Sequence, residues 1–231
     1  MSQWHRPNTT IIMIKIKNFV FNPFGVNTYV ISDTDTGEAI VVDPGMINSR
    51  EHTSLDNYIA ENGLKIQQIV NTHLHLDHCF GDNYVRDKYG VKVAANVNDA
   101  PLGSGIAQQA RSFGMCIPEG QDFDVSIDVP LNEGDVINIG PYKLHVLEIP
   151  GHSAGSIALY CPEGKFVIVG DALFRGAVGR TDLPGGDFNT LASSIRNKLY
   201  TLPDDTKVLA GHDMPTDIGT EKKNNPYVRS V

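Results

Sequence analysis

The most constraining feature of this chain is a short histidine-rich run that follows the apolar stretch 66–70. The run reads Thr72-His73-Leu74-His75-Leu76-Asp77-His78. In an extended chain alternate side chains share a face, so His73, His75 and Asp77 would lie together while the intervening leucines point into the core. His78 breaks the alternation, and we expect the chain to turn there toward a helix. The run therefore predicts a strand end that presents imidazoles and a carboxylate on one side.

Side chains of these types in this arrangement point to a metal site. Imidazole nitrogen and carboxylate oxygen suit zinc, iron and manganese, and no set of thiolates accompanies them. A single histidine on a strand usually has a structural role. Three histidines and an aspartate in so short a stretch have no packing explanation, because each buried polar group needs a partner. We therefore favour metal binding over core packing.

Further residues with ligand chemistry stand at the ends of other apolar stretches. His152, Asp171 and His212 each follow directly after a glycine. Glycine lets the backbone turn sharply or approach a crowded site. An aspartate after a glycine is commonly only part of a turn, so the recurrence of the pattern is stronger evidence than any single case. The ligands predicted for two ions are His73, His75, Asp77, His78, His152, Asp171 and His212.

Short apolar stretches mixed with helical periodicity predict the α/β class, with parallel or mixed sheets. We expect strands at 13–21, 28–32, 39–42, 66–70, 91–95, 136–139, 143–147, 156–160, 166–169 and 207–210. We expect helices at 49–61, 83–88 and 189–200. No internal repeat or low-complexity linker divides the chain, so we predict one domain over residues 1–231.

Residues 101–130 do not fit this pattern. Glycine and proline recur along them and no period is sustained, which is typical of a functional lid or an excursion from the fold. We expect residues 101–125 to line a substrate entrance, with Phe113 and Met115 as its apolar members. The alternative is a solvated loop.

Composition excludes several classes of partner. The 231 residues carry 19 basic and 27 acidic side chains, a net charge of −8, with no basic cluster for nucleic acid or an anionic membrane. No apolar run is long enough for a membrane helix or a secretory signal. The three cysteines, Cys79, Cys116 and Cys161, are widely spaced and form no disulfide framework, which indicates a reducing compartment. We expect a cytoplasmic protein with a frayed tail at residues 1–10.

The order and spacing of these ligands over nearly the whole chain resemble the metallo-β-lactamase fold superfamily. The resemblance implies a four-layer αββα sandwich with the metals at one edge of the sheets. It also implies two divalent ions, with zinc expected and iron or manganese as alternatives, and hydrolysis by a metal-bridging hydroxide. By resemblance, His73, His75 and His152 hold one ion, Asp77, His78 and His212 hold the other, and Asp171 bridges the two. Lactamases of the family often carry cysteine where Asp171 stands and lack a ligand like His78.

Other segments resemble the short glyoxalase II-like hydrolases. They are Asn27-Thr28-Tyr29, Val42-Asp43-Pro44-Gly45, Gly170-Asp171-Ala172-Leu173-Phe174 and Gly179-Arg180-Thr181-Asp182-Leu183-Pro184-Gly185-Gly186-Asp187, with Gly219, Glu221 and Asn225-Pro226 toward the end. We expect no C-terminal helical domain of the kind that helps long glyoxalase II enzymes hold glutathione. Arg180 and Asp182 stand where those enzymes carry a glutathione-contacting lysine and a tyrosine. The resemblance thus implies thioester cleavage and leaves the thiol carrier open.

Several residues have two interpretations. Asp171 would be shared by the two cations, and Asp77 would accept the proton of the attacking water. Asp43 would hold a ligand imidazole by its other ring nitrogen, or would be a simple turn aspartate. Arg180 would meet a substrate carboxylate, or would form an ion pair with Asp182 or Asp187. Cys79 would be a thiolate ligand, or a small buried side chain.

Four alternative functions are weighed beside a small-molecule thioester hydrolase. Iron-dependent persulfide dioxygenases resemble this chain in the same ligands and in a Gly-Arg-Thr-Asp segment, so neither feature excludes them. A lactone or ester hydrolase would use the same hydroxide. A non-catalytic module is disfavoured because degenerate members should lose ligands, whereas this chain keeps all of them. Nucleic-acid processing is disfavoured by the acidic charge.

Overall fold

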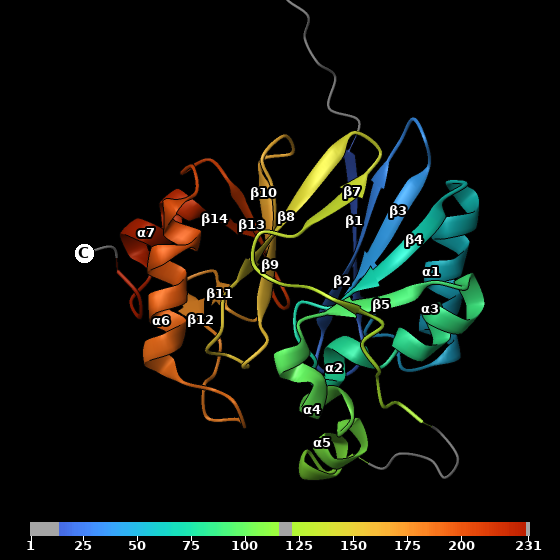
Figure 1. The fold of residues 1–231 in the computed structure, drawn as a ribbon, viewed down its shortest axis with the longest axis horizontal. Helices are drawn as coiled ribbons and strands as arrows, with labels where there is room; N and C mark the ends of the chain where they lie inside the picture. The colour runs from blue at the N-terminus through green and yellow to red at the C-terminus, as the bar shows by residue number, and fades with distance from the viewer. Residues whose placement is uncertain (1–13, 116–121, 230–231) are drawn as a thin grey trace, which may run out of the picture.

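The computed structural model describes residues 14–115 and 122–229, which form four layers with two sheets at the centre (Figure 1). The first six-stranded sheet has the order β1 (Ile14–Phe21), β2 (Val26–Asp33), β3 (Glu38–Val42), β4 (Lys65–Val70), β5 (Lys92–Ala95), β6 (Val129–Pro130). The second has the order β14 (Thr216–Asp217), β13 (Lys207–Ala210), β10 (Phe166–Gly170), β9 (Ile157–Cys161), β8 (Tyr142–Glu148), β7 (Val136–Ile139). A two-stranded ribbon pairs β11 (Leu173–Phe174) with β12 (Ala177–Val178).

Helices cover the outer faces of both sheets. Beside the first sheet lie α1 (Ser49–Glu61) and α3 (Asp82–Tyr89), while α2 (Leu76–Cys79), α4 (Ala100–Gly103) and α5 (Ile106–Ser112) lie below the ends of its strands (Figure 1). The short helix η1 (Val97–Asp99) directly precedes α4. On the side of the second lie α6 (Phe188–Asn197), η2 (Leu199–Thr201) and α7 (Ile218–Asn224) (Figure 1). This arrangement confirms the expected αββα sandwich. Within the described residues, no helix combines the length and the apolar character needed to cross a membrane.

The alternation of side chains along the strands explains the layers. Val30 and Val41 pack with the helices outside the first sheet, whereas the adjacent Ile31 and Ile40 pack between the sheets. Successive side chains of a strand point to opposite faces, so a strand that is apolar at every position is buried on both. All residues of β10, which reads FVIVG, are buried, as this requires. A third core cluster fills the space between the second sheet and α6, η2 and α7.

The two sheets are joined at the edge where the histidine-rich run emerges. The backbone N–H of Asn27, in β2, donates to the carbonyl of Gly211 at 2.6 Å. The hydroxyl of Tyr29 donates to the carbonyl of Ala210 at 2.7 Å. In the second sheet, parallel pairing sets Gly170 of β10 opposite Ala210 of β13. The ends of β4, β10 and β13 therefore meet at one edge of the sandwich.

The predicted ends of the helices agree best with the structure where a side chain caps the helix. Helix α1 covers the predicted 49–61, because the Asn48 side chain accepts from the N–H groups of Arg50 and Glu51 and the helix ends before Gly63. The predicted helix 189–200 was wrong at its end, since α6 stops at Asn197. The chain then re-forms as η2, where Tyr200 is buried and donates to the carbonyl of Val228 at 2.8 Å, so tertiary packing overrides the helical period.

The expectation of an irregular segment over 101–130 was wrong in part. Helices α4 and α5 occupy much of it, and β6 adds an edge strand to the first sheet. Ile106 and Ala110, four residues apart on α5, are both buried against the first core cluster. The predicted strand 13–21 is seen from Ile14 onward. The expectations for residues 1–10 and for Cys116 fall outside the described residues.

Candidate metal centre

The structure brings all of the predicted ligands to one edge of the sandwich. His73 and His75 lie between β4 and α2, and α2 carries Asp77 and His78. His152 lies between β8 and β9, Asp171 follows β10, and His212 follows β13. The site therefore draws on both sheets, and its geometry depends on how the two sheets pack together.

Within the described residues, the side chains fall into overlapping groups whose ligand atoms lie within 4.8 Å of one another. The groups are His73, His75 and His152; His73, His78 and Asp171; and Asp77, His78 and His212. In the first group, Nδ1 of His75 lies 2.9 Å from Nε2 of His152. Two nitrogens on one tetrahedral zinc ion would be about 3.4 Å apart, given zinc–nitrogen distances of about 2.0–2.1 Å. The spacing is thus close to that of two ligands of one ion.

Asp171 lies between the groups. Its Oδ2 is 3.7 Å from Nε2 of His152 and 3.5 Å from Nε2 of His212. Its Oδ1 is 3.4 Å from Nε2 of His78. The two oxygens of one carboxylate therefore face imidazoles of both predicted ion sites, as a bridging ligand requires.

Unpaired buried atoms test whether these residues fit metal ions. Nε2 of His73 and of His78 and Oδ1 of Asp171 are buried and make no hydrogen bond in the part of the chain that the structure describes. An unsatisfied buried polar group costs about 1–3 kcal/mol, and native structures avoid it. A divalent cation would satisfy such atoms, and nitrogen and oxygen donors suit zinc, iron or manganese. The donor set fits.

The protonation states of His73, His75 and Asp171 also suit a cation. Burial, then the neighbouring imidazoles, lowers the pKa of His73 well below its usual value. Burial, then His152, lowers the pKa of His75 to about 3. Both rings are neutral near pH 7, which is the form that binds metal. Burial raises the pKa of Asp171, but His78 and other histidines outweigh this and hold it low, so the carboxylate stays ionised.

Asp43 contacts the predicted ligand segment through its carboxylate. Its carboxylate accepts from the N–H and Oγ1 of Thr72, both at 2.7 Å, and lies 2.9 Å from Nδ1 of His78. Oγ1 of Thr72 lies in turn 3.1 Å from Nδ1 of His73. Asp43 has a φ of 50°, a strained conformation for a residue with a side chain. Asp43 therefore contacts the ring of His78 at Nδ1, the contact that one of its two sequence interpretations predicts.

Asp99 has a comparable place that the sequence reasoning missed. Its Oδ2 accepts from the N–H of Leu74 at 3.1 Å and from Oγ of Ser153 at 2.7 Å. Its Oδ1 accepts from the N–H of Gly155 at 2.6 Å. One buried carboxylate thus joins the backbone between His73 and His75 to the loop of His152. The sequence signal for Asp99 was its position soon after the apolar stretch 91–95, because the predicted ligands also follow apolar stretches.

Two glycines before ligands are required by close packing. A Cβ on Gly211 would lie 2.2 Å from Oδ1 of Asp171 and 2.7 Å from Cε1 of His78. Gly170 has a φ of 49°, and a Cβ there would lie 2.3 Å from Oγ1 of Thr72. The recurrence of glycine before ligands therefore has a steric cause at these two positions.

Arg180 and Cys79 are each found in the less reactive of two predicted arrangements. Arg180 forms an ion pair with Asp182, and Cys79 is a buried core side chain. Nε and Nη2 of Arg180 each donate to the Asp182 carboxylate at 2.7 Å, in an exposed pair. The carbonyl of Arg180, by contrast, lies 2.8 Å from Nδ1 of His152 and fixes that ring. Cys79 is buried in the core, and burial raises the pKa of its thiol well above the usual value. Asp187 caps α6 by accepting from Thr190.

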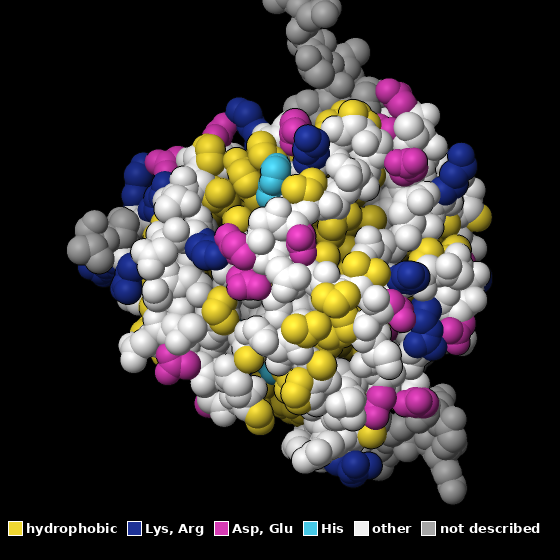
Figure 2. Space-filling view, in the orientation of Figure 1, with side chains coloured by type: hydrophobic (Ala, Val, Ile, Leu, Met, Phe, Trp, Pro, Cys, Tyr) yellow, Lys and Arg dark blue, Asp and Glu magenta, His cyan; other side chains and the backbone are white. Residues whose placement is uncertain are grey.

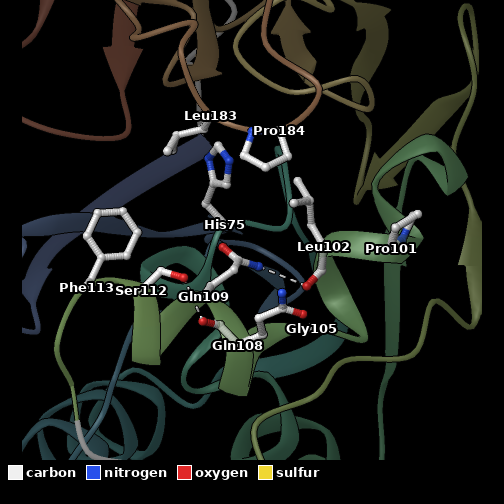
Figure 3. Close-up of a pocket in the computed structure, with 10 residues that line it drawn as sticks. All are labelled: His75, Pro101, Leu102, Gly105, Gln108, Gln109, Ser112, Phe113, Leu183 and Pro184. Atoms are coloured by element: carbon white, nitrogen blue, oxygen red, sulfur yellow. Dashed lines mark hydrogen bonds between the residues drawn. The ribbon is translucent and has the colours of Figure 1, made fainter.

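A cavity of about 180 Å³ lies over the ligands. It is lined by Phe24, His75, Leu76, Asp77, Phe113, His152, Asp171, Arg180, Leu183 and His212. A second cavity, of about 290 Å³, adjoins it beside His75 (Figure 3). A small substrate thus has access to the ligand groups and to a neighbouring space.

Comparison with known proteins agrees with the fold. The chain belongs to the metallo-beta-lactamase superfamily, whose family model matches residues 21–212. A hydroxyacylglutathione hydrolase, GloC of Haemophilus influenzae, is 36% identical over 214 residues, which are 90% of this chain and 94% of that protein.

Two solved structures show the same architecture. The BLEG-1 B3 metallo-beta-lactamase superposes with a TM-score of 0.82 at 32% identity, over 92% of this chain and 99% of that one. TTHA1623, solved in a di-iron-bound form, superposes with a TM-score of 0.78 at 34% identity, over 92% and 100%. The superfamily and its metallo-hydrolases support a metal-dependent hydrolase here.

Proposed function

We propose that this protein hydrolyses thioesters with two divalent metal ions, in the manner of glyoxalase II and on hydroxyacylglutathione-type substrates. The observation that carries the proposal is the Asp171 carboxylate, which lies between imidazoles of both ion sites at 3.4–3.7 Å. The similarity to a hydroxyacylglutathione hydrolase over most of both chains supports the thioester as substrate.

The ligand sets are His73, His75 and His152 for one ion and Asp77, His78 and His212 for the other, with Asp171 shared. Two ions held there would lower the pKa of a shared water toward neutrality and would polarise the thioester carbonyl. Oδ2 of Asp77 is 3.1 Å from Nε2 of His212, and it borders the cavity. Burial raises the pKa of Asp77, but His78 and His212 outweigh this and keep it low. We assign Asp77 to accept the proton released by the attacking water.

Zinc is our first choice of metal, with iron or manganese as alternatives, because nitrogen and oxygen ligands bind all three. We also propose a cytoplasmic location, a small-molecule substrate, and no nucleic-acid or membrane partner. The net charge of −8 supports the last point, since phosphate backbones and anionic lipids would be repelled.

The test is the initial rate of S-D-lactoylglutathione hydrolysis by protein loaded with zinc or iron, beside Asp171→Ala as the blank. Metal content is measured in every sample. A rate well above the blank is expected. No rate from a fully loaded site would overturn the proposal. Oxygen uptake with glutathione persulfide, and hydrolysis of lactones and of a β-lactam, would then decide among the other reactions of this fold.

A further inference from the structure

We propose that the cavity beside His75 receives the acyl group of the thioester and selects acyl groups that are uncharged and largely apolar. This inference rests on the proposed thioester hydrolysis and adds its substrate class. The cavity, here called the acyl pocket, has a volume of about 290 Å³. It is lined by His75, Pro101, Leu102, Gly105, Gln108, Gln109, Ser112, Phe113, Leu183 and Pro184 (Figure 3).

The position of the acyl pocket links it to the reacting centre. His75, Phe113 and Leu183 line both this cavity and the one above the ligands. Figure 3 shows Leu183 and Pro184 on one side of His75, with the residues of α5 on the other. A carbonyl placed over the ligands would therefore send one of its substituents directly into the acyl pocket.

The lining has no charge to offer an anionic substituent. Apart from His75, no residue that lines it is acidic or basic. His75 belongs to the predicted ligand groups, so its ring is committed to the metal centre. Arg180 borders only the neighbouring cavity and is paired with Asp182. On the face drawn in Figure 2, hydrophobic side chains gather in the lower middle, near α4 of Figure 1.

Two polar side chains of the lining, Gln109 and Ser112, hold its shape. Gln109 accepts from the N–H of Leu76 at 3.1 Å and donates to the carbonyls of Leu74 and Leu102 at 3.2 and 2.9 Å. Oγ of Ser112 donates to the carbonyl of Gln108 at 3.1 Å. The side chain of Gln109 therefore fixes α5 against the ligand segment and is occupied by protein partners. A buried substrate carboxylate would find no cation there, and an unpaired buried charge is strongly unfavourable.

Size assigns the pocket to the acyl group and not to the thiol carrier. At about 30 Å³ per water-sized group, the pocket has room for roughly ten non-hydrogen atoms. A glutathionyl tripeptide is larger than this and carries two carboxylates. A short acyl chain fits, and its carrier leaves through the open side of the metal centre.

The experiment measures kcat/KM for acetyl, butyryl, hexanoyl and octanoyl thioesters of N-acetylcysteamine, which is an uncharged thiol. We expect a rise of about threefold to fourfold per added methylene until the pocket is full. Ser112→Trp should lower the ratio of hexanoyl to acetyl kcat/KM by at least about tenfold, because the indole fills the pocket. Gln108→Arg should raise the ratio of glutaryl to pentanoyl kcat/KM, because it adds a cation. Gln67→Arg, on the exposed side of β4, is the matched control and should leave both ratios unchanged.

Failure of this inference is separable from failure of the proposed function. Hydrolysis of every thioester with no dependence on acyl length, or with a dependence on the thiol alone, would overturn the acyl pocket and leave thioester hydrolysis standing. If no thioester is hydrolysed, binding of the non-hydrolysable S-hexyl and S-ethyl N-acetylcysteamine thioethers is measured by calorimetry. Tighter binding of the hexyl compound, lost in Ser112→Trp, would support the pocket; equal binding would overturn it.

Discussion

The two walls of the site are built in different ways. The wall of strand ends, residues 71–78, 151–153, 170–171 and 211–212, holds its imidazoles through buried polar partners such as Asp43 and Asp99. The helical wall, residues 100–113, is half-buried or exposed where it faces the acyl pocket, and Gln109 ties it to the first wall. A change in the first wall disturbs the whole ligand set, whereas the second can vary with little effect on it. The difference separates the part that fixes the chemistry from the part that fixes the substrate.

The largest effect should come from the ligand that both ion sites share. Asp171→Ala should lower kcat/KM by at least about 10³-fold, because it removes the bridge and leaves His78 and His212 without their common carboxylate. Bound metal, measured by mass spectrometry, should fall below two ions per chain. Asp205→Ala, an exposed residue paired with Lys165, is the control and should change neither quantity. Retention of two ions and full activity in Asp171→Ala would contradict the bridging assignment.

A smaller effect should follow from steric pressure on the same wall. Gly211→Ala places a methyl group against Asp171 and His78, and a displacement of about 1 Å in a reacting geometry costs about 10²-fold in rate. Gly63→Ala is the matched control, because Gly63 has a φ of 60° and open space around its Cβ. The control should lose about 1–2 kcal/mol of unfolding free energy and no activity. The comparison fails if the two variants lose stability alike and both retain full activity.

Asp99 should have the next largest effect, and on metal affinity more than on folding. Asp99→Ala should weaken zinc binding about 10–100-fold, because its carboxylate orders the backbone beside His73, His75 and His152. Competition with a chelator measures the affinity, and thermal unfolding measures stability. Asp128→Ala is the control: Asp128 accepts from the N–H of Val93 at 2.9 Å and touches no ligand loop. Equal metal affinity in the two variants would show that Asp99 is only structural.

The wall of strand ends was predictable because its signals are local. A run of histidines and leucines after an apolar strand, and glycines before the other ligands, can be read from single stretches of chain. The predicted extended course of that run was wrong in part, because the chain enters α2 at Leu76 and does not first turn at His78. Asp99 escaped prediction because its role depends on two loops that meet only in the folded protein, near Leu74 and Ser153. The role of Asp43 remained open for the same reason, since a turn aspartate and a histidine partner look alike in sequence.

The sequence predicted the helical wall only as a departure from the regular pattern of strands and helices. Its glycines and prolines indicated an excursion, but α4 and α5 are short and their stability comes from packing, not from propensity. The burial of Ile106 and Ala110 against the core decides where α5 forms. The sequence predicted Phe113 at a substrate entrance, and Phe113 lines the acyl pocket, whereas Met115 packs against the first core cluster. The contribution of Leu183 had no local signal, because it comes from a segment far away in the chain.

The smallest effect should come from Arg180, and it tests how far the first wall extends. Its guanidinium is exposed and paired with Asp182, and such pairs contribute about 0.2–1 kcal/mol. Arg180→Ala keeps the carbonyl that holds His152, so KM for S-D-lactoylglutathione should change less than about threefold. If Arg180 instead binds a glutathione carboxylate, Arg180→Ala should raise KM more than tenfold and Asp182→Ala should lower it. If both variants change KM equally little, Arg180 contributes to the wall of strand ends only through its main-chain carbonyl.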